Sequence, residues 1–276
     1  MNPHAPHPAS PIHLLRSLWH NRQLIRQMTW RDVIGRYKGS AMGLLWSFIT
    51  PLLMLSVYSF VFIGIFKSRW GTDPNEHKGQ FAIVLFTGMI VHALLSDVLN
   101  RAPSLILANV NYVKKVIFPL ETLVVISTGA ALFHALVSLV VLLAASIFLN
   151  GALPWTALYL PLILAPLVIL ALGLGWLLAS LGVFVRDIGQ SIGLVTTVMM
   201  FLSPVFYPIT HLPEEYRIYL MANPISFIVL QTREVLIWGN TPDWYGLGIY
   251  TVIALSIACL GYAWFQKTRK GFADVL

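Results

Sequence analysis

The chain has 276 residues, of which 57% are hydrophobic and only 11% are charged, and its mean hydropathy is +0.75. Typical soluble domains carry about 25% charged residues, so this composition excludes an ordinary soluble protein. The net charge of +7 does not indicate a nucleic-acid-binding protein, because the basic residues lie between apolar stretches rather than in one patch.

The N-terminal part divides into two segments. Residues 1–11 are rich in Pro and His and are predicted to form a disordered tail. Over residues 12–36, apolar positions recur at helical spacing opposite basic and amide side chains. These apolar positions include Leu14, Leu18, Ile25 and Met28. The pattern predicts a basic amphipathic helix in the membrane interface, in contact with lipid. The alternative is a helix packed against protein alone.

The rest of the chain is a series of apolar stretches. Residues 122–185 contain no Asp, Glu, Lys or Arg, which is long enough for two crossings of roughly 20 residues each. Asn150-Gly151 marks a turn between them. We therefore predict an all-α membrane protein in which residues 12–276 form one transmembrane domain. The six predicted spans are about 41–66, 81–99, 120–149, 157–185, 191–207 and 244–265.

The basic residues predict the orientation of these spans. With both termini in the cytoplasm, 13 of the 18 Lys and Arg residues fall in cytoplasmic segments, which agrees with the positive-inside rule. The five predicted outside are Lys67, Arg69, Lys78, Arg217 and Arg233. The single cysteine, Cys259, excludes an intrachain disulfide.

Three further segments are predicted to shape the two membrane faces. Pro103 can begin a short cytoplasmic helix over residues 104–113, although an ordinary loop is the alternative. Residues 207–243 are too long and polar for a hairpin, and are predicted to form two short re-entrant helices. Glycines spaced four apart at 35, 39 and 43, and at 189 and 193, predict close helix packing.

The predicted spans contain few ionisable groups. Asp97 is placed near a helix end beside Arg101, one turn away, and His92 and His134 are more consistent with packing than with a proton relay. A phosphate-binding G-x-x-x-x-G-K-[ST] motif and an H-E-x-x-H zinc pair are absent from the sequence. These features disfavour an ion-coupled transporter and an enzyme, and favour a conduit whose energy comes from another subunit.

Four motifs, spread in order along nearly the whole chain, carry a resemblance to a known family. They are RYKGSAMGLLW at 36–46, VKKVIFPLE at 113–121, VFVRDIG at 183–189 and SPVFYP at 203–208. Together they resemble the membrane subunits of ATP-binding-cassette polysaccharide exporters, and most closely the O-antigen exporter permeases. The chain departs from this pattern at Tyr112-Val113, where an aliphatic pair is expected, and in its N-terminal tail.

The resemblance implies a permease subunit that exports a lipid-linked polysaccharide across the cytoplasmic membrane. It implies two copies of this chain working with two nucleotide-binding ATPase subunits, which would bind ATP and Mg, and a glycan linked to undecaprenyl diphosphate. This chain would then hold no cofactor or catalytic site. Capsule, teichoic-acid and small-molecule export remain alternatives, and a membrane-embedded transferase is less favoured because no acid, base or metal cluster is visible.

The resemblance and the residue types together give candidate sites. Residues predicted to couple to the ATPase are Ser104, Val110, Asn111, Tyr112, Lys114, Lys115, Arg186 and Asp187. Cations that could contact the substrate diphosphate are Arg31, Arg36 and Lys38, although a role in topology alone is the alternative. Aromatic residues that could line a sugar channel, or instead form interfacial belts, are Trp46, Tyr58, Phe62, Phe201, Phe206 and Tyr207.

Overall fold

The computed structural model describes residues 10–65, 70, 80–114 and 118–276, and these residues form helices and turns without any strand. The main helices are α1 Pro11–His20, α2 Arg22–Gly35, α3 Trp46–Tyr58, α4 Gln80–Arg101, α6 Thr122–Asn150, α7 Leu160–Phe184, α8 Ile188–Phe201 and α11 Trp244–Thr268. Two short helices, α9 Glu214–Met221 and α10 Pro224–Arg233, precede α11, and α12 Phe272–Val275 follows it. The predicted all-α membrane class is confirmed.

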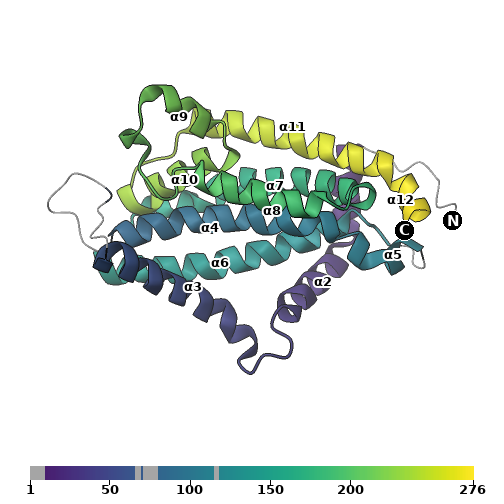
Figure 1. The fold of residues 1–276 in the computed structure, drawn as a ribbon, viewed down its shortest axis with the longest axis horizontal. Coiled ribbons are helices and arrows are strands. Elements are labelled where there is room, and N and C mark those ends of the chain that lie inside the picture. Colours follow the sequence, from purple (N-terminus) through teal and green to yellow (C-terminus); the bar gives the residue numbers. More distant parts are fainter. Residues whose placement is uncertain (1–9, 66–69, 71–79, 115–117) are drawn as a thin grey trace.

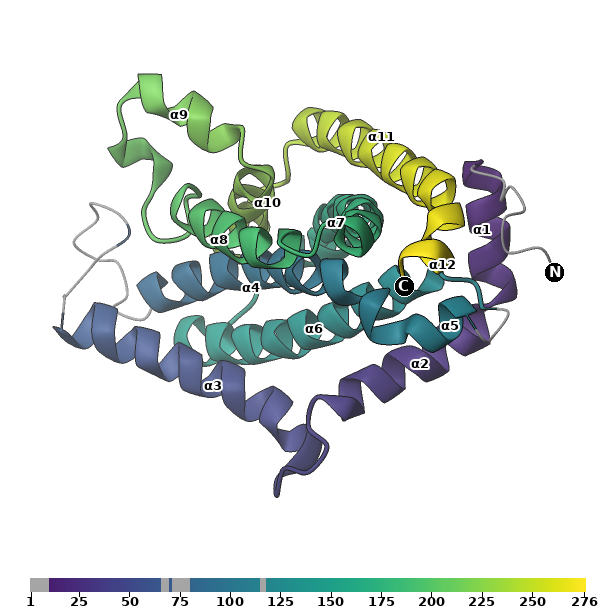
Figure 2. The same ribbon diagram turned by 45° about the vertical axis from the view of Figure 1, so that its right-hand side comes forward.

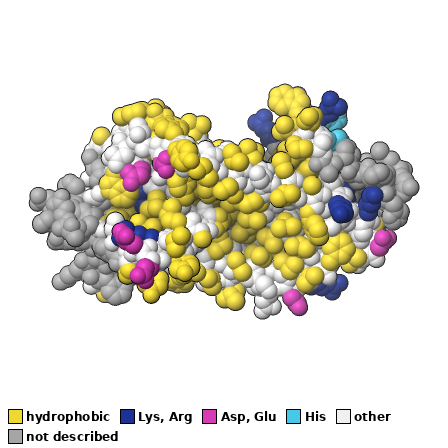
Figure 3. Space-filling view, turned by 90° about the horizontal axis from the view of Figure 1, so that it is seen from above, with side chains coloured by type: hydrophobic (Ala, Val, Ile, Leu, Met, Phe, Trp, Pro, Cys, Tyr) yellow, Lys and Arg dark blue, Asp and Glu magenta, His cyan; other side chains and the backbone are white. Residues whose placement is uncertain are grey.

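The long helices run side by side along the length of the molecule, with α9 and α10 at one end and α1, α5 (Val110–Lys114) and α12 at the other (Figure 1). Helix α4 is the centre of the bundle. Of the residues in its 18-residue apolar stretch, 72% are buried, compared with 11% in the stretch that contains α3. On the face shown in Figure 3, hydrophobic side chains cover the middle, and charged side chains gather near the two ends. This distribution fits a bilayer crossed along the long axis.

Five helical stretches in the described residues are long and apolar enough to cross a membrane: Gly43–Phe62, Gln80–Ser104, Thr122–Leu149, Trp155–Phe184 and Trp244–Val275. They correspond to five of the six predicted spans. The span predicted at 191–207 differs, because α8 has 14 residues and would reach about 21 Å, which is short of a hydrocarbon core. Pro204 explains the early end, since proline lacks the N–H that a helix needs and disfavours helical geometry in the preceding residue.

The segment after α8 contains the pair of short helices predicted there. The stretches Glu214–Met221 and Pro224–Trp238 are bent by 102° relative to each other, as in a broken span or a re-entrant loop. Asn223 begins α10 by accepting a hydrogen bond from the main-chain N–H of Ile225, and it also donates to the carbonyls of Met199 and Leu202. One side chain therefore joins the bend of this hairpin to the end of α8.

The predicted helix over residues 12–36 is divided at Asn21 into α1 and α2, which run in different directions (Figure 2). Of the predicted apolar positions, Leu14, Ile25 and Met28 pack against a buried cluster of the protein. The alternative of packing against protein is therefore correct for these side chains. Different apolar residues of α1, namely Ile12, Leu15 and Trp19, are exposed and available to lipid.

Within the described part of this single chain, close helix packing does not occur at four of the five predicted glycines, and a Cβ at Gly189 would make only an ordinary contact with Pro103. A Cβ added at Gly35, Gly39, Gly43 or Gly193 would meet nothing within 4 Å among the described residues, and Gly39 and Gly43 are turn residues with positive φ. Close approach occurs instead between α7 and α11, where a Cβ at Gly261 would lie 2.1 Å from the carbonyl oxygen of Gly173. Spacing along one helix does not reveal which face a partner helix covers.

We expect Gly261→Ala to lower the thermal unfolding temperature of the detergent-purified chain, because the added methyl group meets rigid main chain and overpacking costs about 1–3 kcal/mol. Gly248→Ala in the same helix is the matched control, since a Cβ there meets nothing within 4 Å in the described structure. Equal unfolding temperatures for the two variants would contradict this packing of α7 on α11.

Candidate functional site

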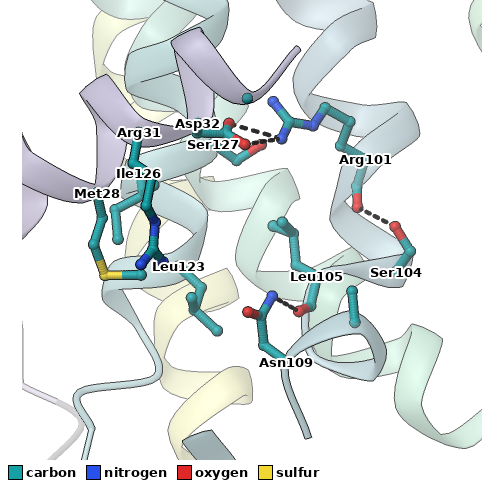
Figure 4. Close-up of a pocket in the computed structure, with 12 residues that line it drawn as sticks. Met28, Arg31, Asp32, Arg101, Ser104, Leu105, Asn109, Leu123, Ile126 and Ser127 are labelled. Carbon is teal, nitrogen blue, oxygen red and sulfur yellow. Dashed lines mark hydrogen bonds and ion pairs between the residues drawn. The ribbon is translucent and has the colours of Figure 1, made fainter. Parts of the chain in front are cut away.

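The segment after α4 is a series of short helical turns, where the sequence predicted one helix over residues 104–113. Single turns at Ala102–Ser104 and Leu107–Asn109 precede α5. The Ser104 hydroxyl donates to the carbonyl of Arg101 (3.0 Å), and the Asn109 amide donates to the carbonyl of Leu105 (2.8 Å), as Figure 4 shows. Side-chain bonds of this kind compete with a regular helical ladder, which explains the interruptions.

Residues 102–104 pack tightly on the end of α7 that is predicted to be cytoplasmic. A Cβ at Gly182 would lie 2.2 Å from the carbonyl oxygen of Pro103, so only glycine allows this approach. Arg186 and Asp187, in the turn that follows α7, are exposed. The turn at Arg186 and Asp187 therefore lies at the same end of the bundle as residues 102–114, which we call the coupling segment after their predicted role. This segment exposes Ser104, Asn111 and Lys114. Val110 is partly buried, and Lys115 lies outside the described residues.

Tyr112 connects the coupling segment to the interior. Its ring stacks on Phe118 with a centroid separation of 4.5 Å and an interplanar angle of 13°. Its hydroxyl accepts a hydrogen bond from Nη2 of Arg31 (3.3 Å) on α2. A displacement of α5 would therefore move α2 through the Arg31 hydrogen bond, and the segment before α6 through the Phe118 ring.

A buried ion pair at the start of α6 joins three more elements. The Glu121 carboxylate is 4% exposed and lies 2.9 Å from Nη1 of Arg269, at the end of α11. It also accepts a hydrogen bond from the hydroxyl of Ser17 on α1 (2.8 Å). Nη2 of Arg269 donates to the carbonyl of Phe118 (3.1 Å), and the Trp176 indole of α7 donates to the carbonyl of Glu121 (3.0 Å). Sequence analysis did not single out this group.

Two ion pairs connect α2 with α4. Nη2 of Arg101 donates to both carboxylate oxygens of Asp32, at 2.8 and 2.7 Å, and Arg36 pairs with Asp97. The sequence placed Asp97 beside Arg101 on the same helix, but each of these side chains has its partner on α2. Both pairs are partly exposed, so their contribution to stability is modest, while their geometry fixes the position of α2 on the bundle.

The three cations predicted for the substrate diphosphate do not gather in one pocket. Arg31 lines a pocket of about 370 Å³ between α2, the coupling segment and α6, across which Asp32 and Arg101 meet (Figure 4). Arg36 lines a separate pocket of about 390 Å³ between α4 and α6 and is already paired, and Lys38 is exposed. A headgroup role for these residues remains a prediction.

The two histidines predicted inside spans make packing contacts. Nε2 of His92 lies 2.9 Å from the carbonyl oxygen of Thr196 on α8, and Nδ1 of His134 lies 3.3 Å from the hydroxyl of Tyr37. Burial raises the pKa of the Tyr37 phenol, so this hydroxyl stays protonated. Each histidine therefore joins two segments by a hydrogen bond, in agreement with the packing interpretation.

Most of the aromatic candidates gather at the end of the bundle opposite the coupling segment. Tyr58, Phe62 and Phe206 pack against one apolar cluster that includes Trp70 and Phe81. Phe201, which is exposed, stacks on Phe206 at 5.6 Å, and the Tyr207 hydroxyl donates to the carbonyl of Phe201 (2.9 Å). Trp46 lies apart, at the opposite end of α3. Their role as channel lining remains a prediction.

Arg233, one of the five cations predicted to lie outside, is not a solvent-exposed loop residue. Its side chain is completely buried at the end of α10, where it donates to the carbonyls of Val84, Pro204 and Val205. No sequence pattern indicated this burial, since the three carbonyls belong to segments far from Arg233 along the chain.

This arrangement defines a polytopic membrane subunit with a compact set of helical turns at one end that can contact another protein. The model of the ABC-2 type transporter family matches residues 23–237, and the chain belongs to this family. It is 26% identical over 258 residues to the O-antigen export system permease protein RfbA of Klebsiella pneumoniae, covering 92% of this chain and 95% of that protein.

Other relatives are named for related polymers. The polysialic acid transport protein KpsM of Escherichia coli is 24% identical over 87% of this chain and 91% of its own length. The capsule polysaccharide export inner-membrane protein CtrC of Neisseria meningitidis is 25% identical over 92% of this chain and 94% of its own length. The chain is therefore a permease of the kind found in polysaccharide export systems, and its part in such a system is transport.

Proposed function

We propose that this chain is the permease subunit of an exporter that moves a lipid-linked polysaccharide, such as O-antigen, across the cytoplasmic membrane. Two copies of the chain would form the conduit, and two separate ATPase subunits would bind ATP and Mg and supply the energy. The observation that carries this proposal is the family membership together with relatives named for O-antigen, polysialic acid and capsule export.

The coupling segment supports the proposed contact with an ATPase. Residues 102–114 and the turn at Arg186 and Asp187 lie at one end of the bundle and expose polar and basic side chains. Behind them, Tyr112 and the Glu121–Arg269 pair connect the segment to α1, α2, α6 and α11. A force on the exposed surface would therefore reach several helices at once.

Capsular polysaccharide is the second candidate cargo, and the capsule and polysialic acid relatives favour it.

The lipid carrier proposed for O-antigen is undecaprenyl diphosphate. The cations proposed to contact its diphosphate on entry are Arg31, Arg36 and Lys38. Aromatic faces near Phe201 and Phe206 would stack on sugar rings along the path.

Deletion of the gene in its native host tests the proposed function. We expect lipid-linked polymer to accumulate inside the cell, and expression of the intact chain to restore the surface polymer. Chemical analysis of the accumulated polymer would separate O-antigen from capsule. Normal surface polymer of both kinds after deletion would contradict polysaccharide export by this chain.

The proposed orientation places both termini and the coupling segment in the cytoplasm and α9 and α10 outside. In a Cys259→Ser background, we expect a cysteine at the exposed Ser104 to resist a membrane-impermeant maleimide in intact cells and to react after the membrane is opened. A cysteine at Tyr216, exposed on α9, is the matched control and should react in intact cells. The reverse labelling pattern would invert the topology.

A further inference from the structure

Arg233 joins three parts of the outer end of the bundle through one side chain. Its Nε donates to the carbonyl of Val84 on α4 (3.0 Å), its Nη1 to the carbonyl of Pro204, and its Nη2 to the carbonyl of Val205 (2.9 Å). The guanidinium also lies over the indole of Trp70, with 4.4 Å between its central carbon and the ring centroid. The side chain is 0% exposed.

This cation has no acidic partner within ion-pair distance in the part of the chain that the structure describes. A buried charge costs several kcal/mol unless it is paired and fully hydrogen-bonded, so an apolar residue here would be the simpler way to stabilise the core. In the described structure, three carbonyl dipoles and the Trp70 ring stabilise the guanidinium. The bundle is also shaped for the side chain, because a Cβ at Gly88 would lie only 2.9 Å from Nη2.

The acceptors show what Arg233 holds in place. Pro204 and Val205 belong to the turns after α8, outside any helix, and Arg233 itself ends α10 of the bent hairpin. The ends of α4, α8 and α10 lie close together in both ribbon views (Figures 1 and 2). In the described structure, separating the post-α8 turns from the hairpin would break the bonds that Arg233 makes to Pro204 and Val205 and those that Asn223 makes to Met199 and Leu202, but none of the main-chain hydrogen bonds within a helix.

We propose that Arg233 is the positioning residue of an outer gate. In the resting state it holds residues 203–208 and the hairpin against α4, and during transport it releases the carbonyls of Pro204 and Val205 so that this end of the conduit opens. The inference rests on the proposed export function, since a gate is needed only if a polymer leaves the bundle here.

The test uses the permease assembled with its ATPase subunits in proteoliposomes, in a Cys259→Ser background with a single cysteine in place of Val205, which is 0% exposed at rest. A membrane-impermeant maleimide is applied to the hairpin side. We expect labelling during ATP turnover to exceed labelling at rest on the order of tenfold, because a minor open state is populated to about 10% or less at rest. A cysteine at Tyr216, exposed in the structure, should be labelled equally in both conditions.

Arg233→Met should raise the resting labelling of the Val205→Cys chain toward the value reached during turnover. Arg233→Lys keeps the charge but loses the planar guanidinium, so its resting labelling should lie between those of the Arg233 and Arg233→Met chains. If Arg233→Met does not fold, Gly88→Ala provides a milder change, because its methyl group would displace Nη2 of Arg233. It should also raise the resting labelling. Normal export with labelling that never changes during turnover would overturn the gate and leave Arg233 as a structural clamp. Absence of export by the unsubstituted complex would instead contradict the proposed function.

Discussion

Reversing the charge of Glu121 is expected to remove most of the correctly folded permease. Glu121→Arg would place two guanidinium groups together where Glu121 is 4% and Arg269 is 15% exposed, and it would also remove the acceptor of the Ser17 hydroxyl. Breaking a buried pair typically costs about 3–5 kcal/mol, which is a large part of the stability of a domain. Thermal unfolding and the yield of monodisperse protein in detergent measure the loss.

The double variant Glu121→Arg with Arg269→Glu is the critical companion, because it restores opposite charges at the same two positions. We expect it to recover a substantial part of the unfolding temperature, and Glu215→Arg, at an exposed position on α9, to leave it nearly unchanged. If the double variant is no better than Glu121→Arg alone, the carboxylate acts through the Ser17 hydroxyl and not through Arg269.

The apolar core of the fold could be predicted because the bilayer imposes strong constraints on sequence. The uncharged stretch 122–185 gives α6 and α7, and the predicted turn contains Gly151 with a φ of +78°. The length of α8 could not be predicted from apolarity, since Ser203 to Pro208 is also uncharged. There, the proline main chain rather than hydrophobicity ends the helix.

The candidate site was predictable only where its residues are close in sequence. The coupling segment was found from Pro103 and the following lysines, but the partners of Asp97 and Arg101 come from α2, which spacing along α4 cannot reveal. Glu121 offered one usable signal: it is the last charged residue before an uncharged stretch, and such a residue at a span boundary needs a partner. No comparable signal pointed to Arg269 as that partner.

The second large effect is expected at Gly182, where the coupling segment touches the end of α7. In Gly182→Ala the new Cβ would stand 2.2 Å from the carbonyl oxygen and 2.6 Å from Cα of Pro103. Because both are main-chain atoms, the methyl group cannot be accommodated by a rotamer change, and residues 102–104 must move away from α7. That displacement separates the coupling segment from the turn at Arg186 and Asp187, the other proposed contact with the ATPase.

We therefore expect Gly182→Ala to reduce polymer export on the order of tenfold per ATP hydrolysed, since a shift of about 1 Å in a positioned element can cost far more than its contact energy. Gly193→Ala is the matched control, because a Cβ there meets nothing within 4 Å in the described part of the chain. Export and ATP hydrolysis are measured together in proteoliposomes that contain the permease and its ATPase. Unchanged export per ATP in Gly182→Ala would show that the contact between Pro103 and Gly182 does not transmit the ATPase motion.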